Sequence, residues 1–211
     1  ATAIIAVQGP GSDAILPFAD LDYMAFRVTQ FAGVPCTVCR TGYTGERGVE
    51  ILVAAQDAGA VWDALVAAGA VLCGLGARDT LRTEMGYALH GHELAPDVPA
   101  RWSSVSWAVV AGKGDFMGRQ AYVETEPEQK IVGLLVTGRG IPRAGMEVLR
   151  GDERVGMTTS GTFSPTLQQG IALARVAREV SPGDEVQIVV RGRNVPAQVV
   201  VLPFVPARVR G

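Results

Sequence analysis

Cysteine, aromatic side chains and long apolar runs are scarce in this sequence, and charge of neither sign dominates. Three cysteines among 211 residues cannot form a disulfide framework. Cys36 and Cys39 have the C-x-x-C spacing, but VPCTVC is typical of a strand, where residues three apart point to opposite faces. The sequence has no second cysteine pair that would complete a zinc site. Neither a redox centre nor a structural zinc site is therefore expected.

The absence of a dominant charge excludes further classes of protein. A net charge of −2 gives no electrostatic attraction toward nucleic acid or an anionic membrane surface. The longest apolar stretch, Ala58–Cys73, is interrupted by Asp63 and by glycines, so no transmembrane helix is predicted. The first residues, ATAIIAVQGPGS, show no targeting pattern. These features favour a cytoplasmic protein without a nucleic acid or membrane partner.

The N-terminal half of the sequence alternates short strands with helices, which predicts an α+β or α/β domain. Pro35 favours the edge of a sheet or the start of a strand. Glycines are dense between Thr41 and Gly48, where the backbone can turn tightly or approach a ligand. The predicted strands are Ala3–Val7, Phe26–Gln30, Val34–Arg40 and Val49–Val53, and the predicted helices are Ser12–Leu16, Asp57–Ala68 and one that begins at about Ala77.

After Glu124 the helical periodicity disappears. The polar segment Thr125–Lys130 is a predicted linker, which gives domain boundaries of 1–124 and 131–211. Short strands separated by turn sequences follow, and this spacing predicts a small antiparallel β-barrel or sandwich without a helix of more than two turns. The predicted strands are Ile131–Thr137, Glu147–Leu149, Val155–Thr159, Ile171–Val176, Glu185–Arg191 and Pro196–Val201.

One acidic residue interrupts an apolar stripe on the helix from Ala77. The stripe contains Ala77, Leu81, Met85 and Ala88, and Glu84 falls within the same arc, whereas Arg78, Asp79, Arg82 and Thr83 are expected on a solvated face. A buried carboxylate without a partner costs several kcal/mol. Glu84 must therefore have a partner, face a cavity or take a proton. A structural ion pair with Arg40 or Arg78 is one interpretation.

Four strings in fixed order indicate a family. They are RTGYTGERGVEI at Arg40–Ile51, GLGARDTLRTEMG at Gly74–Gly86, W-x8-FMGR at Trp107–Arg119 and VGMTTSGTFSPTL at Val155–Leu167. Together they resemble the T-protein of the glycine cleavage system, an aminomethyltransferase of glycine catabolism that uses tetrahydrofolate. The resemblance covers almost the whole chain. It implies an α+β fold, with a partial folate-binding domain followed by the small antiparallel β-barrel or sandwich.

The resemblance also implies roles for individual residues. The acid within R-x-E-x-G binds the pterin ring of the folate in this family, which assigns that role to Glu84. A carboxylate suits this role because it can accept two hydrogen bonds from adjacent pterin N–H groups. Tyr43 is expected to stack on the folate, and Lys113, Arg208 and Arg210 are expected to serve its negatively charged tail. Packing for Tyr43 and simple solvation for the cations are the alternatives.

The resemblance does not supply a catalytic residue within this sequence. The family's LQGP-like segment corresponds to Val7–Pro10, so the family's N-terminal portion has no counterpart here. The catalytic aspartate of the family belongs to that portion, and no aspartate among these residues matches its motif. We therefore expect a fragment that binds folate and is inactive alone.

Two other groups invite catalytic or metal-binding interpretations. His90, His92 and Glu93 resemble a metal-binding cluster, but no third ligand has helical spacing, so a structural turn and no metal are expected. Ser160 and Ser164 lie outside any G-x-S-x-G elbow, and turn positions in the barrel are expected for both.

The expected reaction transfers an aminomethyl group from the lipoyl arm of a partner, the H-protein, to tetrahydrofolate with release of ammonia. Three alternatives remain. They are the folate-binding domain of a dimethylglycine or sarcosine dehydrogenase or of a related demethylase, a folate-binding protein without catalysis, and an inactive chain that folds only in part.

Overall fold

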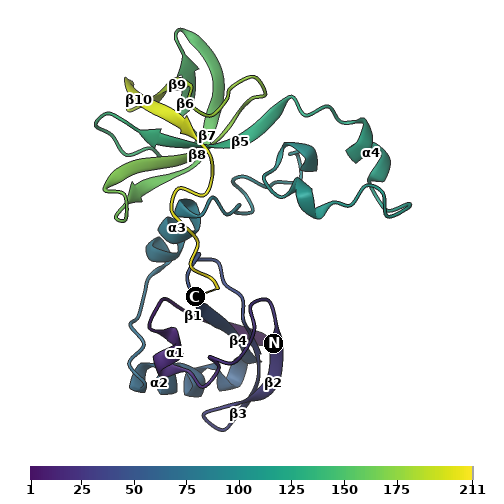
Figure 1. Ribbon diagram of the computed structural model, residues 1–211, viewed down its shortest axis with the longest axis vertical. Helices are drawn as coiled ribbons and strands as arrows, with labels where there is room; N and C mark the ends of the chain where they lie inside the picture. Colours follow the sequence, from purple (N-terminus) through teal and green to yellow (C-terminus); the bar gives the residue numbers. More distant parts are fainter. Residues whose placement is uncertain (211) are drawn as a thin grey trace. The chain divides into compact units, whose positions relative to one another are not determined.

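The computed structural model describes residues 1–210, which form two compact units (Figure 1). Unit 1 contains residues 1–81 and the C-terminal residues from Pro206, and unit 2 contains residues 82–205. The division falls within helix α3 (Leu75–Glu84). The domain boundaries predicted from the sequence follow composition rather than compactness, and they stay a prediction.

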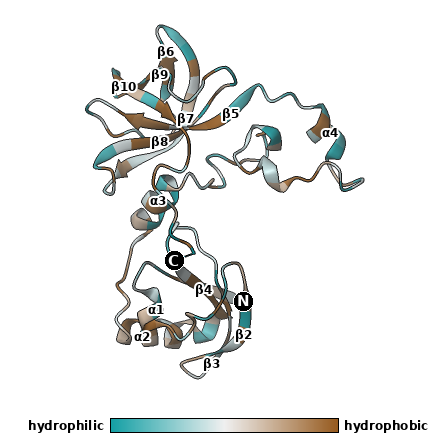
Figure 2. Cartoon of the chain, in the orientation of Figure 1, coloured by the Kyte–Doolittle hydropathy of each residue, from teal (hydrophilic) through white to brown (hydrophobic). Residues whose placement is uncertain are grey.

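Unit 1 is built on a four-stranded antiparallel sheet in the order β1-β4-β3-β2. Exposure alternates along these strands, and the less exposed residues of β3 and β4 are buried, as expected when one face of a sheet packs on a core. Ile51, Val38 and Val61 have no exposed surface and join strand to helix in this core. Figure 2 shows mostly hydrophobic colour along β4. The strands are β1 (Thr2–Gln8), β2 (Phe26–Phe31), β3 (Val34–Cys39) and β4 (Gly48–Ala54), and the helices are α1 (Ser12–Ile15), η1 (Ala55–Asp57) and α2 (Ala58–Ala67).

The position of Pro35 distinguishes its two predicted roles. Strand β3 lies between β4 and β2, so Pro35 is not on an edge strand. It is the second residue of β3, and the pairing of β3 with β4 starts one residue later, at Cys36. Because proline has no N–H group to donate, this position costs no hydrogen bond with β4.

Helix α3 ends four residues earlier than the apolar stripe suggests. Gly86 has a φ of +69°, and the N–H groups of Gly86 and Tyr87 bond back to Thr83 and Arg82. A left-handed glycine with such bonds ends a helix. Arg82, Thr83 and Glu84 are all buried, and Ala77 is exposed, so the predicted solvated face for Arg82 and Thr83 is wrong. The last turn is buried all round.

The C-terminal part of unit 2 is a closed antiparallel barrel in the order β10-β5-β8-β7-β6-β9. Its interior is filled by valine, leucine, isoleucine and alanine side chains. All six predicted strands are present, and closure selects the barrel over the sandwich. Residues 131–200 contain no α-helix, as predicted. The strands are β5 (Gln129–Val136), β6 (Glu147–Arg150), β7 (Glu153–Ser164), β8 (Gln169–Ala177), β9 (Glu185–Val190) and β10 (Arg193–Val200).

The segment between α3 and the barrel contains only short helices. They are η2 (Ala100–Trp102), η3 (Ser106–Ala108) and α4 (Arg119–Glu124). Backbone and side-chain hydrogen bonds hold the segment together. In one of them, Trp102 Nε1 donates to the Glu126 carbonyl at 2.9 Å. No helix in residues 1–210 has both the length and the apolar character needed to cross a membrane.

Both faces of β8 are covered. Ala172, Ala174 and Val176 point into the barrel core. Ile171 and Leu173 point to the other face, where they pair with Thr162 and Ser160 of β7 and are fully buried. Paired residues of antiparallel strands share a face. This outer face of the barrel is therefore a second buried layer within unit 2.

A buried ion pair lies on this outer face. Arg82 Nη1 is 3.1 Å from Glu93 Oε2, and both side chains are at most 1% exposed. Ser160 joins them, since its hydroxyl accepts from Arg82 Nη2 at 2.7 Å and donates to Glu93 Oε1 at 2.7 Å. The Leu89 N–H donates to Glu93 Oε2 as well. The pair thus fixes the end of α3 and the following turn on β7.

We expect Glu93→Ala to lower the free energy of unfolding by about 3–5 kcal/mol, because it removes the carboxylate that pairs with the buried Arg82 guanidinium. The double variant Arg82→Met with Glu93→Leu is expected to lose less, since it removes both charges. Urea unfolding of the wild type, the single and the double variant measures this. An equal loss in the single and double variants would contradict it.

The three cysteines should differ in reactivity. All are unpaired, Cys36 is buried and Cys73 is exposed. Burial raises the pKa of the Cys36 and Cys39 thiols, and Glu50 adds to the rise at Cys39. We expect iodoacetamide to label Cys73 first, and the labelling of Cys36 to need denaturant, because the thiolate is the nucleophile. Mass spectrometry of peptides at several pH values checks this, and early labelling of Cys36 would contradict it.

Candidate functional site

Glu84 is the last residue of α3 and is held by two hydroxyl groups. Its Oε1 accepts from Ser164 Oγ at 2.5 Å, and its Oε2 accepts from Thr166 Oγ1 at 3.1 Å. The Glu84 backbone carbonyl accepts from the Phe204 N–H at 2.9 Å. The residue is 2% exposed. The partners belong to the string TSGTFSPTL, so the structure joins two of the four strings in the sequence through one carboxylate.

These contacts show that Glu84 has partners, which was one of the three options open to a buried carboxylate. Within unit 1, the Arg40 guanidinium donates to backbone carbonyls and Arg78 lies over an aromatic ring. The ion pair of Glu84 with either arginine stays a hypothesis. Within unit 2, the buried Glu84 carboxylate has hydroxyl donors in place of a cation. Such donors suit a carboxylate because it can accept about four hydrogen bonds.

The serine donors come from one face of β7, and Thr166 follows the end of this strand. Ser160, Thr162 and Ser164 alternate along the strand and are all buried. The Ser160 hydroxyl donates to Glu93, and the Ser164 hydroxyl donates to Glu84. The prediction that Ser160 and Ser164 occupy turns is therefore wrong. Their spacing of two to four residues is the signal that could have placed them on one strand face.

The histidines of LHGHEL contact the backbone and serine rather than one another. His92 Nδ1 is 2.8 Å from the Thr159 carbonyl oxygen and 3.4 Å from Ser160 Oγ. His90 is exposed and forms a β-bridge with Leu94. Glu93 is occupied by Arg82. Within residues 1–210, His, Cys, Asp and Glu form no group of three that could hold a metal ion.

The glycine-rich loop between β3 and β4 packs on strand β1. Gln8 Nε2 donates to the carbonyls of Thr41 and Val49, and its Oε1 accepts from Thr44. A Cβ at Gly42 would lie 1.9 Å from Gln8 Oε1, and one at Gly48 would lie 2.3 Å from the Val7 carbonyl oxygen. These two glycines therefore permit close approach to Val7 and Gln8 of the chain itself.

Tyr43 lies in this loop and is half-buried. The Arg78 guanidinium carbon lies 4.6 Å from the centre of its ring, within the range of a cation–π contact. Arg78 belongs to α3, so this contact joins the first and second strings. Tyr43 thus packs against a cation. Its position between two glycines was the feature that marked it in the sequence.

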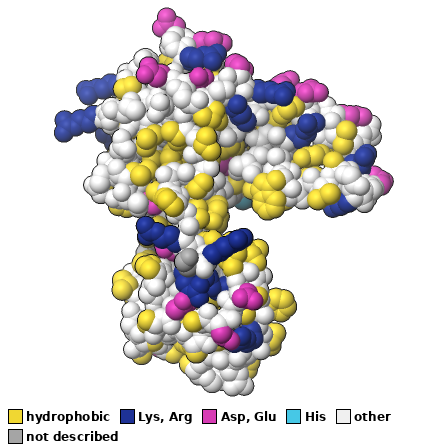
Figure 3. Space-filling view, viewed as in Figure 1, with side chains coloured by type: hydrophobic (Ala, Val, Ile, Leu, Met, Phe, Trp, Pro, Cys, Tyr) yellow, Lys and Arg dark blue, Asp and Glu magenta, His cyan; other side chains and the backbone are white. Residues whose placement is uncertain are grey.

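The C-terminal residues pack on unit 1 beside the same loop. The Arg208 N–H donates to the Gly45 carbonyl at 2.7 Å, and Arg208 Nη1 is 3.7 Å from Glu46 Oε1. The Arg210 guanidinium carbon lies 5.6 Å from the centre of the Tyr23 ring. The structure thus brings Tyr43 and Arg208 to one loop, and Figure 3 shows Lys and Arg side chains gathered on the visible face of unit 1.

The buried Arg40 side chain connects the C-terminal residues of the chain to the sheet of unit 1. It is 2% exposed, and its guanidinium donates to the carbonyls of Gly48 at 2.9 Å and Val209 at 3.0 Å. Burial lowers the pKa of Arg40, and the nearby charge of Arg47 lowers it further. Sequence reasoning considered Arg40 only as a partner of Glu84 and missed this role. No local pattern reveals it, because the partner lies 169 residues away.

Lys113 lies in unit 2 on the exposed loop before α4. Its Nζ is 4.8 Å from the centre of the Phe116 ring, three residues further along the chain. Lys113 and Glu84 form no ion pair in the described chain, so the structure does not bring these two predicted site residues into contact.

Comparison with known families accounts for most of the chain. The family described as the GCVT N-terminal domain matches residues 1–113, which is more than half of the sequence. The family described as the glycine cleavage T-protein C-terminal barrel domain matches residues 129–206. The second match coincides with the closed barrel.

Individual relatives agree with these matches. The chain is 51% identical over 221 residues to an aminomethyltransferase of Mycolicibacterium paratuberculosis and 48% identical over 219 residues to one of Frankia alni. These alignments cover 99% and 98% of this chain but 60% of each relative. The chain therefore spans about 60% of the length of the curated relatives it matches.

A solved structure supports the same assignment. The crystal structure of the glycine cleavage system aminomethyltransferase T from Bartonella henselae is 33% identical, with a TM-score of 0.88. It matches 98% of this chain, which spans 60% of that structure's chain. The strings, the barrel and both family matches lead to one conclusion: the chain belongs to the glycine cleavage T-protein family.

Proposed function

We propose that this chain provides the pterin-binding part of a tetrahydrofolate-dependent aminomethyltransferase of the glycine cleavage system. The observation that supports this most directly is the arrangement of Glu84. It ends α3 within R-x-E-x-G, and it is oriented by Ser164 and Thr166 of the barrel string. Two strings typical of the family thus converge on one carboxylate.

Glu84 would anchor the pterin ring. Each of its two oxygens accepts one hydroxyl, and each has capacity for a second donor. A pterin presents a ring N–H beside an exocyclic amine, which match the two oxygens of a carboxylate. The hydroxyl groups would hold the carboxylate in position before the ligand arrives, which lowers the cost of binding.

Residues of unit 1 and Lys113 would contribute further contacts. Tyr43 already packs against the Arg78 guanidinium, and its ring would stack on an aromatic ring of the folate. Arg208 and Arg210 are exposed, as is Lys113, and would attract the carboxylates of the folate tail. Exposed cations of this kind contribute modestly to affinity.

The reaction would take its one-carbon group from a partner. An aminomethyl group on the lipoyl sulfur of the H-protein would pass its carbon to the folate amines. The carbon–sulfur bond would break, ammonia would leave, and methylene-tetrahydrofolate would form. The principal task of the protein would be to hold the folate amine against this carbon, since orientation supplies much of the rate in such a step. The three unpaired cysteines favour a reducing compartment, so the cytoplasm is part of this proposal.

We expect Glu84→Gln to weaken tetrahydrofolate binding about 10- to 100-fold, because hydrogen bonds to a charged group contribute about 1.5–3 kcal/mol. Gln is preferred to Ala because Glu84 is buried, and the amide oxygen can still accept from Ser164. Isothermal titration calorimetry measures the affinity, and Glu185→Gln on β9 serves as the matched control. A Glu84→Gln variant with unchanged folate affinity would contradict the assignment.

The 211-residue chain alone is expected to bind tetrahydrofolate weakly and to produce no methylene-tetrahydrofolate from aminomethylated H-protein. No aspartate here matches the catalytic motif of the family, and catalysis depends on contacts that strengthen in the transition state. A chain of the full length of the relatives, assayed in parallel, is the positive control. Turnover by the 211-residue chain at the rate of the longer one would contradict this expectation. It would instead place the catalytic group within these residues.

A further inference from the structure

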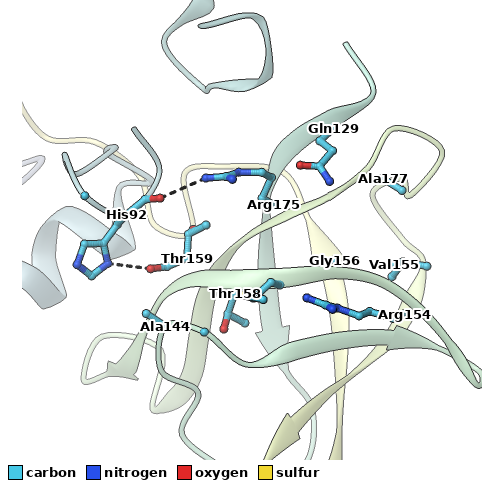
Figure 4. Close-up of a pocket in the computed structure, with 13 residues that line it drawn as sticks. His92, Gln129, Ala144, Arg154, Val155, Gly156, Thr158, Thr159, Arg175 and Ala177 are labelled. Atoms are coloured by element: carbon cyan, nitrogen blue, oxygen red, sulfur yellow. Dashed lines mark hydrogen bonds between the residues drawn. The ribbon is translucent and has the colours of Figure 1, made fainter. Parts of the chain in front are cut away.

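A cavity of about 550 Å³ opens on the outer surface of unit 2 (Figure 4). Glu84 is not among the residues that line it. Strands β5, β7 and β8 supply most of its wall, together with the turn at Gly91 and His92 and the turn at Gly145. The proposed function does not use this cavity. Its residues come from a single compact unit, so its shape is a property of that unit alone.

The charged side chains that line the cavity are all basic. Arg154 of β7 and Arg175 of β8 line it, and no lining residue is an aspartate or glutamate. The nearest carboxylate partner is Glu147 on β6, which lies 3.6 Å from Arg154 Nε in an exposed pair. Such an exposed pair is weak and can exchange its partner. A second cavity of about 370 Å³ on the barrel is lined by Glu185 and by no arginine, so it lacks the basic lining of the first.

Arg175 is incompletely satisfied. Its Nη2 donates to the His92 carbonyl at 3.4 Å, which is long for a hydrogen bond. Its Nε is buried and has no hydrogen-bond partner within residues 1–210. A buried donor without an acceptor costs about 1–3 kcal/mol. An anion in the cavity would supply a charge-assisted acceptor when the guanidinium turns toward it.

Figure 4 shows the polar side chains of the lining. Gln129, Arg154 and Arg175 line the same cavity from different strands, and the Arg175 guanidinium is directed toward the His92 carbonyl. Gly91 and Gly145 have no neighbouring atom within 4 Å of where a Cβ would lie, and the side chain of Met157 adds an apolar wall. Two guanidinium groups with an amide and a short apolar wall fit a small anion that has a hydrocarbon body.

We propose that this cavity binds a small organic anion through a carboxylate or phosphate group, with Arg175 and Arg154 as its ligands. Glutarate and inorganic phosphate serve as probes for the two kinds of anion. Each is titrated into the full 211-residue chain by calorimetry at constant ionic strength. Saturable binding of either probe, with one site per chain, is the expected result, and the probe that binds more tightly identifies the group.

Variants test the two arginines. Arg175→Gln is expected to weaken binding at least about tenfold, which corresponds to about 1.4 kcal/mol. Arg154→Gln is expected to weaken it by a smaller factor, and it keeps the fold because the side chain is exposed. Arg193→Gln, at an exposed arginine of β10 outside the cavity, should leave affinity unchanged. Absence of saturable binding of both probes would overturn the proposal, as would equal losses in the Arg154 and Arg193 variants.

Discussion

Two buried carboxylates in unit 2 must find hydrogen-bond donors, and much of that unit is arranged to supply them. Glu84 accepts from Ser164 and Thr166, and Glu93 accepts from Arg82, Ser160 and the Leu89 backbone. An unpaired buried charge costs several kcal/mol, so these contacts are obligatory once the helix end packs on the barrel. The same contacts fix where α3 ends and which face of β7 it covers.

The two carboxylates differ in a way that bears on function. Glu93 is paired with a cation and fully buried, which suits a structural role. Within unit 2 the Glu84 carboxylate accepts from two neutral hydroxyls and has no salt bridge. A site that orients a carboxylate and leaves its charge available is suited to a ligand with paired N–H donors. The proposed pterin contact depends on this geometry.

Unit 1 contains the reverse case, in which a buried cation needs hydrogen-bond acceptors. Arg40 is buried among backbone carbonyls, one of them from Val209 in the C-terminal tail. Arg208 adds a backbone bond to Gly45 and an ion pair to Glu46. The tail is therefore part of unit 1 because a buried guanidinium needs acceptors that the glycine loop supplies only in part.

The sequence by itself determined most of the elements, because alternation, glycine turns and helical periodicity are local signals. It predicted the six barrel strands, and its four strings indicated the family. Only the tertiary structure decided barrel over sandwich, since closure depends on pairing between β10 and β5, about sixty residues apart. The partners of Glu84, Arg82 and Arg40 also depended on packing. The charge of a residue shows that it needs a partner, but only the folded chain decides which group is close enough to be one.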